Sequence, residues 1–242
     1  MAEFNLQRLE DDGFKRVLCV VAHPDDIEYG TSAAVAAWTA RGIEVCYLLL
    51  TGGEAGMQRP PEQTRVLRAA EQREASEVVG VQDLTILDHP DGMLVYSLDI
   101  RRDIARHIRK IRPDVVVTGS WEVEFVAGLN QADHRVAGLA CVDAIRDADN
   151  TWVFPELAAD EVLPKWGVSW LLVAGDSRPT HAVDVSGRPL ERGILALEAH
   201  GDYLGGLSGH PLPRDLLTEM TTAQGAALGV PNAVAFRAYK LR

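Results

Sequence analysis

The residues best suited to chemistry lie in one short segment, Ala22-His23-Pro24-Asp25-Asp26. It holds one imidazole and two adjacent carboxylates, which are side chains that bind divalent transition metals. A catalytic zinc ion uses about three protein ligands and keeps one position open for water or substrate. His23 and Asp26 offer two ligands from this segment, so a third ligand must come from elsewhere in the chain.

The best candidate for that third ligand is His134, in the segment Gln131-Ala132-Asp133-His134-Arg135. This segment comes after a predicted strand at 115–118 and begins a predicted helix at about 132–147. The first segment follows a predicted strand at 17–22. The carboxyl ends of parallel strands meet at one edge of a sheet, where ligands of open α/β folds bind. The sequence therefore predicts a metal site made of His23, Asp26 and His134.

The second of the two adjacent aspartates has a different expected role. When Asp26 binds a metal, its neighbour Asp25 cannot easily reach the same ion. Asp25 is then free to accept a proton from an attacking water as a general base. Pro24 restricts His23 to an extended backbone. The spacing alone also fits a solvated turn without a metal, and that alternative stays open at this point.

Strand and helix patterns alternate along the chain, which predicts an α/β fold with a Rossmann-like, doubly wound and mostly parallel sheet. One or two antiparallel strands are expected near the C-terminus, and no boundary divides residues 1–242 into more than a single domain. The expected strands are at 17–22, 45–50, 84–87, 115–118, 168–174, 182–185 and 234–240. The expected helices are at 30–41, 61–79, 97–111, 132–147 and 189–200.

Composition narrows the class of protein. The 242 residues are 47% hydrophobic, enough for a substantial core, and carry a net charge of −11. That charge argues against nucleic acid or an anionic membrane as the main partner. Three scattered cysteines, no apolar leader at the N-terminus and no apolar run of 18 residues together predict a cytoplasmic protein without a membrane span. The oligomeric state is open, and a homo-oligomer is compatible with the sequence.

The segment from Ala22 to Gly30 resembles the opening motif of the LmbE/PIG-L family of zinc-dependent N-deacetylases. Further segments resemble the family's motifs in the same order. They are Thr51-Gly52-Gly53-Glu54-Ala55-Gly56, Arg73-Glu74 followed by Gly80, Pro90-Asp91-Gly92 and Asp133-His134-Arg135. The resemblance implies N-deacetylation of an N-acetylglucosamine-type amino sugar, or hydrolysis of the N-acyl amide of a related natural-product or thiol-precursor conjugate. One zinc ion, or another divalent transition metal, is the implied cofactor.

Carried over by position, the resemblance assigns His23, Asp26 and His134 to the metal and Asp25 to the general base. It also implies that three residues of the other family-like segments contact the substrate. These are Glu54 in the glycine-rich loop, Arg73 in the long helix, and Asp91.

The chain departs from the family at Gln131, where a histidine normally helps to stabilise the oxyanion and Asp133 tunes it. The Gln131 amide can donate a hydrogen bond, but it cannot deliver a proton. Either Asp25 or His200, at the end of a predicted helix, must then protonate the leaving amine. A metal- or sugar-binding protein with weakened or no catalysis is the alternative. Apolar residues in expected loops also suit an acyl or aglycone pocket: Met57, Met93, Tyr96, Trp121, Phe125 and Leu204.

Overall fold

A computed structural model describes residues 6–242, whose main feature is an eight-stranded sheet in the order β1-β9-β10-β8-β5-β2-β3-β4. The pairs from β8 to β4 are all parallel, whereas β10 runs antiparallel to both β8 and β9. The strands are β1 (Gln7–Arg8), β2 (Arg16–Val21), β3 (Glu44–Leu49), β4 (Asp83–Ile86), β5 (Val115–Gly119), β8 (Trp170–Ala174), β9 (His181–Asp184) and β10 (Ala233–Lys240). A small hairpin of β6 (Glu124–Phe125) and β7 (Gly128–Leu129) stands apart from the sheet.

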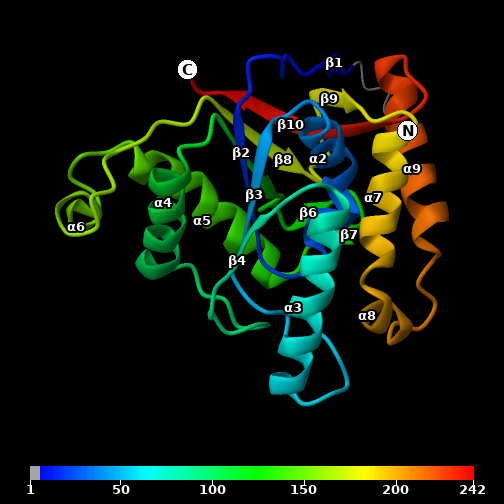
Figure 1. Ribbon diagram of the computed structural model, residues 1–242, viewed down its shortest axis with the longest axis horizontal. Helices are drawn as coiled ribbons and strands as arrows, with labels where there is room; N and C mark the ends of the chain where they lie inside the picture. The colour runs from blue at the N-terminus through cyan, green and yellow to red at the C-terminus, as the bar shows by residue number, and fades with distance from the viewer. Residues whose placement is uncertain (1–5) are drawn as a thin grey trace.

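Helices cover both faces of this sheet (Figure 1). The helices α4 and α5 pack on one face, and α2, α7 and α9 lie on the other side. The helices are α1 (Asp26–Gly30), α2 (Ser32–Thr39), α3 (Pro61–Val78), α4 (Leu98–Ile111), α5 (Ala132–Ala148), α6 (Pro155–Ala159), α7 (Arg188–Glu198), α8 (Gly201–Gly205) and α9 (Pro213–Leu228). No helix within residues 6–242 has the length and apolar character needed to cross a bilayer.

The strand β2 is apolar from Val17 to its end at Val21. Val17, Cys19 and Val21 pack into the core on the α2 side, whereas Leu18 and Val20 pack into the core on the α4 and α5 side. Successive side chains of a strand point to opposite faces. A strand that is covered on both faces must therefore be apolar at every position, as parallel strands generally are.

The predicted α/β fold, with its mostly parallel sheet and antiparallel addition near the C-terminus, is confirmed. Several elements differ. The helix expected at 30–41 is α2, and the unpredicted turn of α1 precedes it and ends at Thr31, whose backbone is non-helical with φ −140°. The short elements α6, α8, β1, β6 and β7 were also not predicted. The helix α9 was not predicted, because polar and small residues such as Thr221 and Gly225 weaken its apolar pattern. Pro213 in its first turn and Gly229 in the left-handed conformation after its end were the available signals.

The sheet also explains where a site can form. The chain runs from β2 to β3 and β4 in one direction and then returns to β5 on the other side of β2. The order of strands therefore reverses between β2 and β5. In open α/β sheets the loops that leave such a pair of strands diverge and form a crevice that binds ligands. The segment after β2 carries His23, and the segment after β5 leads to His134.

Candidate metal centre

The segment after β2 folds tightly around the carboxylate of Asp26. Its Oδ2 accepts hydrogen bonds from the backbone amides of Ala22 at 3.1 Å and His23 at 2.9 Å. The other oxygen, Oδ1, lies 3.1 Å from Nε2 of His134. Asp25 adopts a left-handed backbone with φ 83°, a conformation that is costly for a residue with a side chain and is often found at functional sites.

The two ring nitrogens of His23 have different surroundings. Nε2 lies 3.0 Å from Oδ1 of Asp91 and 3.4 Å from Oδ2 of Asp133. Nδ1 lies 3.6 Å from Oδ2 of Asp26. A hydrogen on Nε2 that is donated to these carboxylates leaves Nδ1 with a free lone pair on the side of Asp26. Metal-binding histidines are commonly oriented in this way by a carboxylate.

His134, in the first turn of α5, is oriented by a neighbour that sequence reasoning missed. Its Nδ1 lies 3.2 Å from Oδ1 of Asn130. The amide group of Asn130 donates to the carbonyls of Ser120 at 2.6 Å and Glu122 at 3.1 Å, so its oxygen faces the ring. His134 therefore donates from Nδ1 and presents Nε2 to Asp26. Asn130 stands one turn of helix before His134, and that spacing was the available signal.

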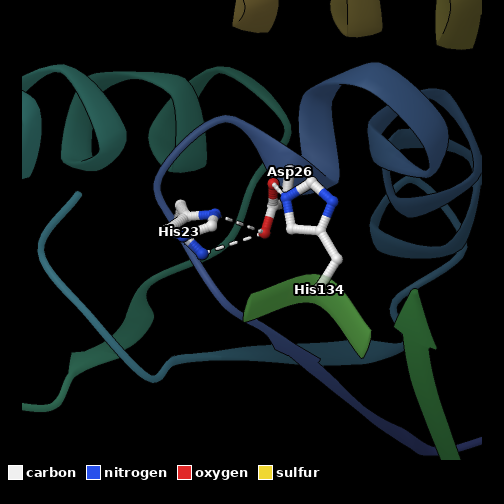
Figure 2. A group of neighbouring side chains, drawn as sticks. All are labelled: His23, Asp26 and His134. Carbon is white, nitrogen blue, oxygen red and sulfur yellow. Dashed lines mark hydrogen bonds and ion pairs between the residues drawn. The ribbon is translucent and has the colours of Figure 1, made fainter. Parts of the chain in front are cut away.

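His23, Asp26 and His134 thus converge from the segment after β2 and from the first turn of α5 (Figure 2), with ligand atoms within 4.8 Å of one another. The separation of 3.1 Å between Nε2 of His134 and Oδ1 of Asp26 is close to the edge of a tetrahedron with bonds of ~2.05 Å, which is about 3.3 Å. A second group, His23 with Asp91 and Asp133, is equally compact. Its two carboxylates are only 5% and 3% exposed, against 16% and 24% for the side chains of Asp26 and His134. Only the first group is open to a substrate.

The charges around the cluster favour a cation. Burial acts against a charge on His23, but the carboxylates of Asp26, Asp133 and Asp91 outweigh it and raise the pKa of His23 to about 12. Burial likewise opposes the charge on His134, and Asp26 outweighs it and raises the pKa. For Asp26, both imidazoles overcome burial and hold the pKa well below its usual range. A site that stabilises protons on two imidazoles this strongly also stabilises a metal ion between them.

Asp25 is buried beside an arginine that sequence reasoning did not select. Nη2 of Arg68 donates to Oδ1 of Asp25 at 2.9 Å and to the carbonyl of Pro24 at 2.6 Å. Its Nη1 donates to the carbonyl of Gly53 at 3.1 Å. Burial raises the pKa of Asp25 to about 7, Arg68 acts to lower it and Asp26 acts to raise it. A Cβ at Gly53 would collide with the Arg68 guanidinium, so a glycine is required there.

Arg73, the substrate-binding candidate in α3, lies on a different face of the helix. Its side chain is exposed, and its Nη1 donates to the carbonyl of Ala69 at 3.4 Å. Arg68 is five residues earlier, about 140° away around a helix of 3.6 residues per turn. The buried face of α3 is the one that carries Arg68 and Gln72. The structure therefore brings Arg68 to the cluster and does not bring Arg73.

The other substrate-binding candidates, Glu54 and Asp91, hold loops together. Glu54 accepts from the backbone amides of Gly52 at 3.1 Å and Asp91 at 3.2 Å. Asp91 accepts from the amide of Ala55 at 2.7 Å while it contacts His23. Asp133 accepts from the amides of two residues in the same loop, 92 and 94, at 2.7 and 3.1 Å. These carboxylates fix the loop that supports His23.

The two candidates for oxyanion and acid chemistry lie in contrasting places. Gln131 is exposed at the N-terminus of α5, three residues before His134. His200 has no exposed surface, and its Nε2 lies 3.5 Å from Oε2 of Glu28. Glu28 is joined to Asp25 through Gln72, which donates to Glu28 and accepts from the amide of Asp25. His200 is thus buried against Glu28, whereas Gln131 is exposed at the start of the helix that carries His134.

Comparison with known proteins adds a family match. Residues 18–145 match the family described as PIG-L, GlcNAc-PI de-N-acetylase. A diacetylchitobiose deacetylase of Thermococcus kodakarensis is 33% identical over 134 residues, covering 54% of this chain and 49% of that protein. A 1D-myo-inositol 2-acetamido-2-deoxy-alpha-D-glucopyranoside deacetylase of Kineococcus radiotolerans is 31% identical over 182 residues, covering 60% and 50%. The chain spans about half the length of these curated relatives.

The fold is also similar to that of a solved structure. The N,N'-diacetylchitobiose deacetylase of Pyrococcus horikoshii superposes with a TM-score of 0.84 and 22% sequence identity. The superposition covers 95% of this chain and 85% of that one. At this level of identity the likeness concerns the fold, and the site must be judged on its own residues.

Proposed function

Because the chain belongs to the PIG-L family of GlcNAc-PI de-N-acetylases, we propose that it hydrolyses an N-acyl amide with the help of one divalent metal ion, zinc. The proposed substrate is a small amide, an N-acetylglucosamine-type amino sugar or a related natural-product or thiol-precursor conjugate. The observation that carries the proposal is the placement of a buried Asp25 next to an accessible cluster of two histidines and one aspartate. The proposal includes no nucleic acid or membrane partner, and it allows assembly into a homo-oligomer.

The residues fit such a metal ion. His23 offers Nδ1, Asp26 offers Oδ1 and His134 offers Nε2, a nitrogen and oxygen set that suits zinc. When bound there, a divalent metal would polarise the amide carbonyl and lower the pKa of a water molecule towards ~7. The chain's contribution is to hold these three side chains in place through Asp91, Asp133 and Asn130.

Asp25 supplies the proton chemistry in this proposal. A pKa near 7 means that an appreciable fraction of Asp25 is ionised at neutral pH and can accept a proton from the attacking water. The same carboxyl group can then return the proton to the leaving amine, so that water is added across the amide and an acid and an amine result. This assigns both steps to Asp25, because His200 has no exposed surface from which to reach a substrate.

Gln131 is the proposed oxyanion donor. It lies three residues before His134 at the exposed start of α5, where its amide can reach the rim of the cluster. It is a neutral donor, and a neutral hydrogen bond is about half as strong as a charge-assisted one. Asp133 stays with the loop that orients His23. We therefore propose a slower enzyme than one with a histidine at this position.

Turnover of zinc-loaded protein on a panel of N-acetylated amino sugars tests the proposal. Asp25→Asn should retain one metal ion per chain but lose activity by a factor of roughly 10²–10⁴, the usual contribution of a general base. Asp12→Asn, at a fully exposed carboxylate, is the matched control and should behave as the parent. Full amide hydrolysis by Asp25→Asn would refute the assignment of the base.

The alternative is a protein that binds metal or sugar without turnover. The replacement of a histidine by Gln131 favours this alternative, whereas the buried Asp25 with a pKa near 7 opposes it, because binding alone needs no base. Metal-loaded protein that binds an amino sugar in calorimetry but releases no amine over many hours would establish the alternative.

A further inference from the structure

A large cavity opens directly from the accessible side of the metal cluster. Its volume is about 870 Å³, and Asp26 and His134 form part of its wall. The carboxylates of Asp91 and Asp133 and the side chain of Asp25 do not line it. The cavity therefore adjoins the cluster at Asp26 and His134, and not at Asp91 and Asp133, the carboxylates that orient His23.

The wall of the cavity is mainly aliphatic. On the sheet side it consists of residues such as Cys19, Val21 and Val117, which face the α2 side of the sheet. On the opposite side α9 contributes Leu217 and Met220, and it contributes Ala227 towards its end. These residues occur at helical spacing along one face of α9, the helix that packs against β10 and α7.

The cavity follows the edge of the sheet for a considerable distance. It is lined in turn by residues at the ends of β2, β5 and β8 and at the beginning of β10, which are neighbours in the sheet. Three strand spacings of about 4.8 Å make this path roughly 14 Å long. The far end is formed by Leu6, Ala227 and Ala235, which belong to a small apolar cluster of their own.

The charged side chains in the wall are already paired within the protein. Asp176 accepts from the backbone amide of Arg178 at 2.8 Å and lies 3.5 Å from the guanidinium of Arg237. Oε1 of Glu28 accepts from Gln72 at 3.2 Å, and its Oε2 lies 3.5 Å from Nε2 of His200. Beyond the metal cluster, the cavity thus presents mainly aliphatic surface and carboxylates that face partners within the protein, and it suits an uncharged apolar occupant.

The cavity is much larger than an acetyl group requires. An acetyl methyl would fill a small part of a cavity of about 870 Å³, and pockets of 300–1,000 Å³ accommodate drug-sized ligands. Each methylene group that moves from water into such a wall improves binding about fourfold.

We propose that this cavity binds a linear aliphatic acyl chain, so that the preferred substrate is a fatty N-acyl amino sugar and not its N-acetyl counterpart. The proposal rests on the amide hydrolysis proposed above. Water adds to the acyl carbon, the bond between that carbon and the nitrogen breaks, and a fatty acid and an amine are formed. The acyl chain lies along the cavity from Asp26 towards Ala227, and the amine leaves on the side of Asp25.

The test compares glucosamines that carry N-acetyl, N-butanoyl and N-octanoyl groups, with metal-loaded enzyme. We expect kcat/KM to rise with chain length, by up to about fourfold for each added methylene, until the far end is reached. The octyl glycoside of N-acetylglucosamine carries its alkyl chain on the other side of the amide, so its kcat/KM should not exceed that of the N-acetyl substrate. A preference for N-acetyl, or a gain with the octyl glycoside instead of the N-octanoyl substrate, would overturn the proposal.

A variant at the far end refines the test. Ala227→Phe should remove most of the advantage of the N-octanoyl substrate and leave hydrolysis of the N-acetyl substrate unchanged. Thr218→Phe is the matched control, since this residue of α9 is exposed and does not line the cavity. Unchanged selectivity in Ala227→Phe, confirmed as folded by its melting curve, would contradict the placement of the chain.

Calorimetry separates this inference from the proposed function. Octanoate should bind the metal-loaded protein more tightly than acetate, and Ala227→Phe should reduce that difference. Equal affinity for both acids would refute the chain site whatever the enzyme hydrolyses. Tight octanoate binding by a protein that hydrolyses none of the amides would refute the amidase function and support the chain site.

Discussion

The two segments that build the cluster are held in different ways. The segment after β2 is fixed by buried groups: Asp26 accepts two backbone amides, and Gln72 and Arg68 bind the two polar atoms of the peptide group between Pro24 and Asp25. In the segment before α5, His134 is oriented by Asn130, and Gln131 lies exposed at the helix start. The positions of the metal ligands and base thus depend on a buried network. Gln131, where the family resemblance leads one to expect a histidine, lies at the solvent edge.

The largest expected effect comes from breaking the first segment. Asp26→Ala removes a metal ligand and leaves the amides of Ala22 and His23 without their acceptor. Without the metal ion the transition state loses about 4 kcal/mol of stabilisation, which lowers activity by roughly 10³-fold. Each buried donor left unpaired costs about 1–3 kcal/mol of stability. Metal content, turnover and the melting temperature of chelator-treated protein measure these effects.

His134→Ala is the matched variant in the second segment. It should also abolish metal binding, but its side chain is partly exposed and supports less of the surrounding backbone. We expect the melting temperature of the chelator-treated protein to stay near that of the parent, whereas Asp26→Ala should lower it by roughly 2–4 °C for each kcal/mol lost. Equal destabilisation by the two variants would mean that the segments are held alike.

A smaller effect is expected from placing a histidine at the exposed position 131. Gln131→His replaces a neutral donor with one that can carry a charge. A charge-assisted hydrogen bond contributes about 1–1.5 kcal/mol more than a neutral one, which corresponds to a roughly tenfold rise in kcat. Metal affinity should not change, because the three ligands are untouched.

Gln131→Ala provides the converse measurement. Removal of an oxyanion donor typically lowers kcat by about 10²–10³-fold. If Gln131→Ala and the parent turn over at the same rate, the amide of Gln131 does not contact the oxyanion, and another group must do so.

The same difference between buried and exposed groups explains what could be predicted from the sequence. The apolar runs of β2 and β5 predicted neighbouring strands, and the polar residues after them predicted that His23 and His134 would meet. Arg68 could not be chosen over Arg73 in this way. The choice depends on the rotation of α3, which is decided by packing against the cluster.

The cavity was only partly foreseeable. Of the apolar loop residues expected to form a pocket, Phe125 lines it, whereas the other five do not. Most of the wall comes from strand ends and from α9, a helix whose pattern of small and polar residues gave a weak signal. A cavity depends on what several distant elements leave unfilled. No local pattern in the sequence encodes that.

The smallest expected effect concerns the ion pair between Arg68 and Asp25. Asp25 must be ionised to accept a proton, so activity should fall as the pH drops through its pKa. Burial raises that pKa to about 7, and the charge of Arg68 opposes the rise. Arg68→Gln should therefore move the acidic limb of the kcat/KM profile to higher pH, by about 1 to 3 pH units for loss of a neighbouring opposite charge.

The controls for this prediction come from the same helix. Arg73→Gln removes an exposed guanidinium on another face of α3 and should leave the acidic limb in place. Arg68→Lys keeps a positive charge beside Asp25, so its limb should lie between those of the parent and Arg68→Gln. A bound metal ion lowers the pKa of Asp25 in every variant alike, and the comparison between variants is unaffected. An acidic limb that moves with Arg73→Gln and not with Arg68→Gln would place the functional arginine on the exposed face of α3, as the sequence motif alone suggests.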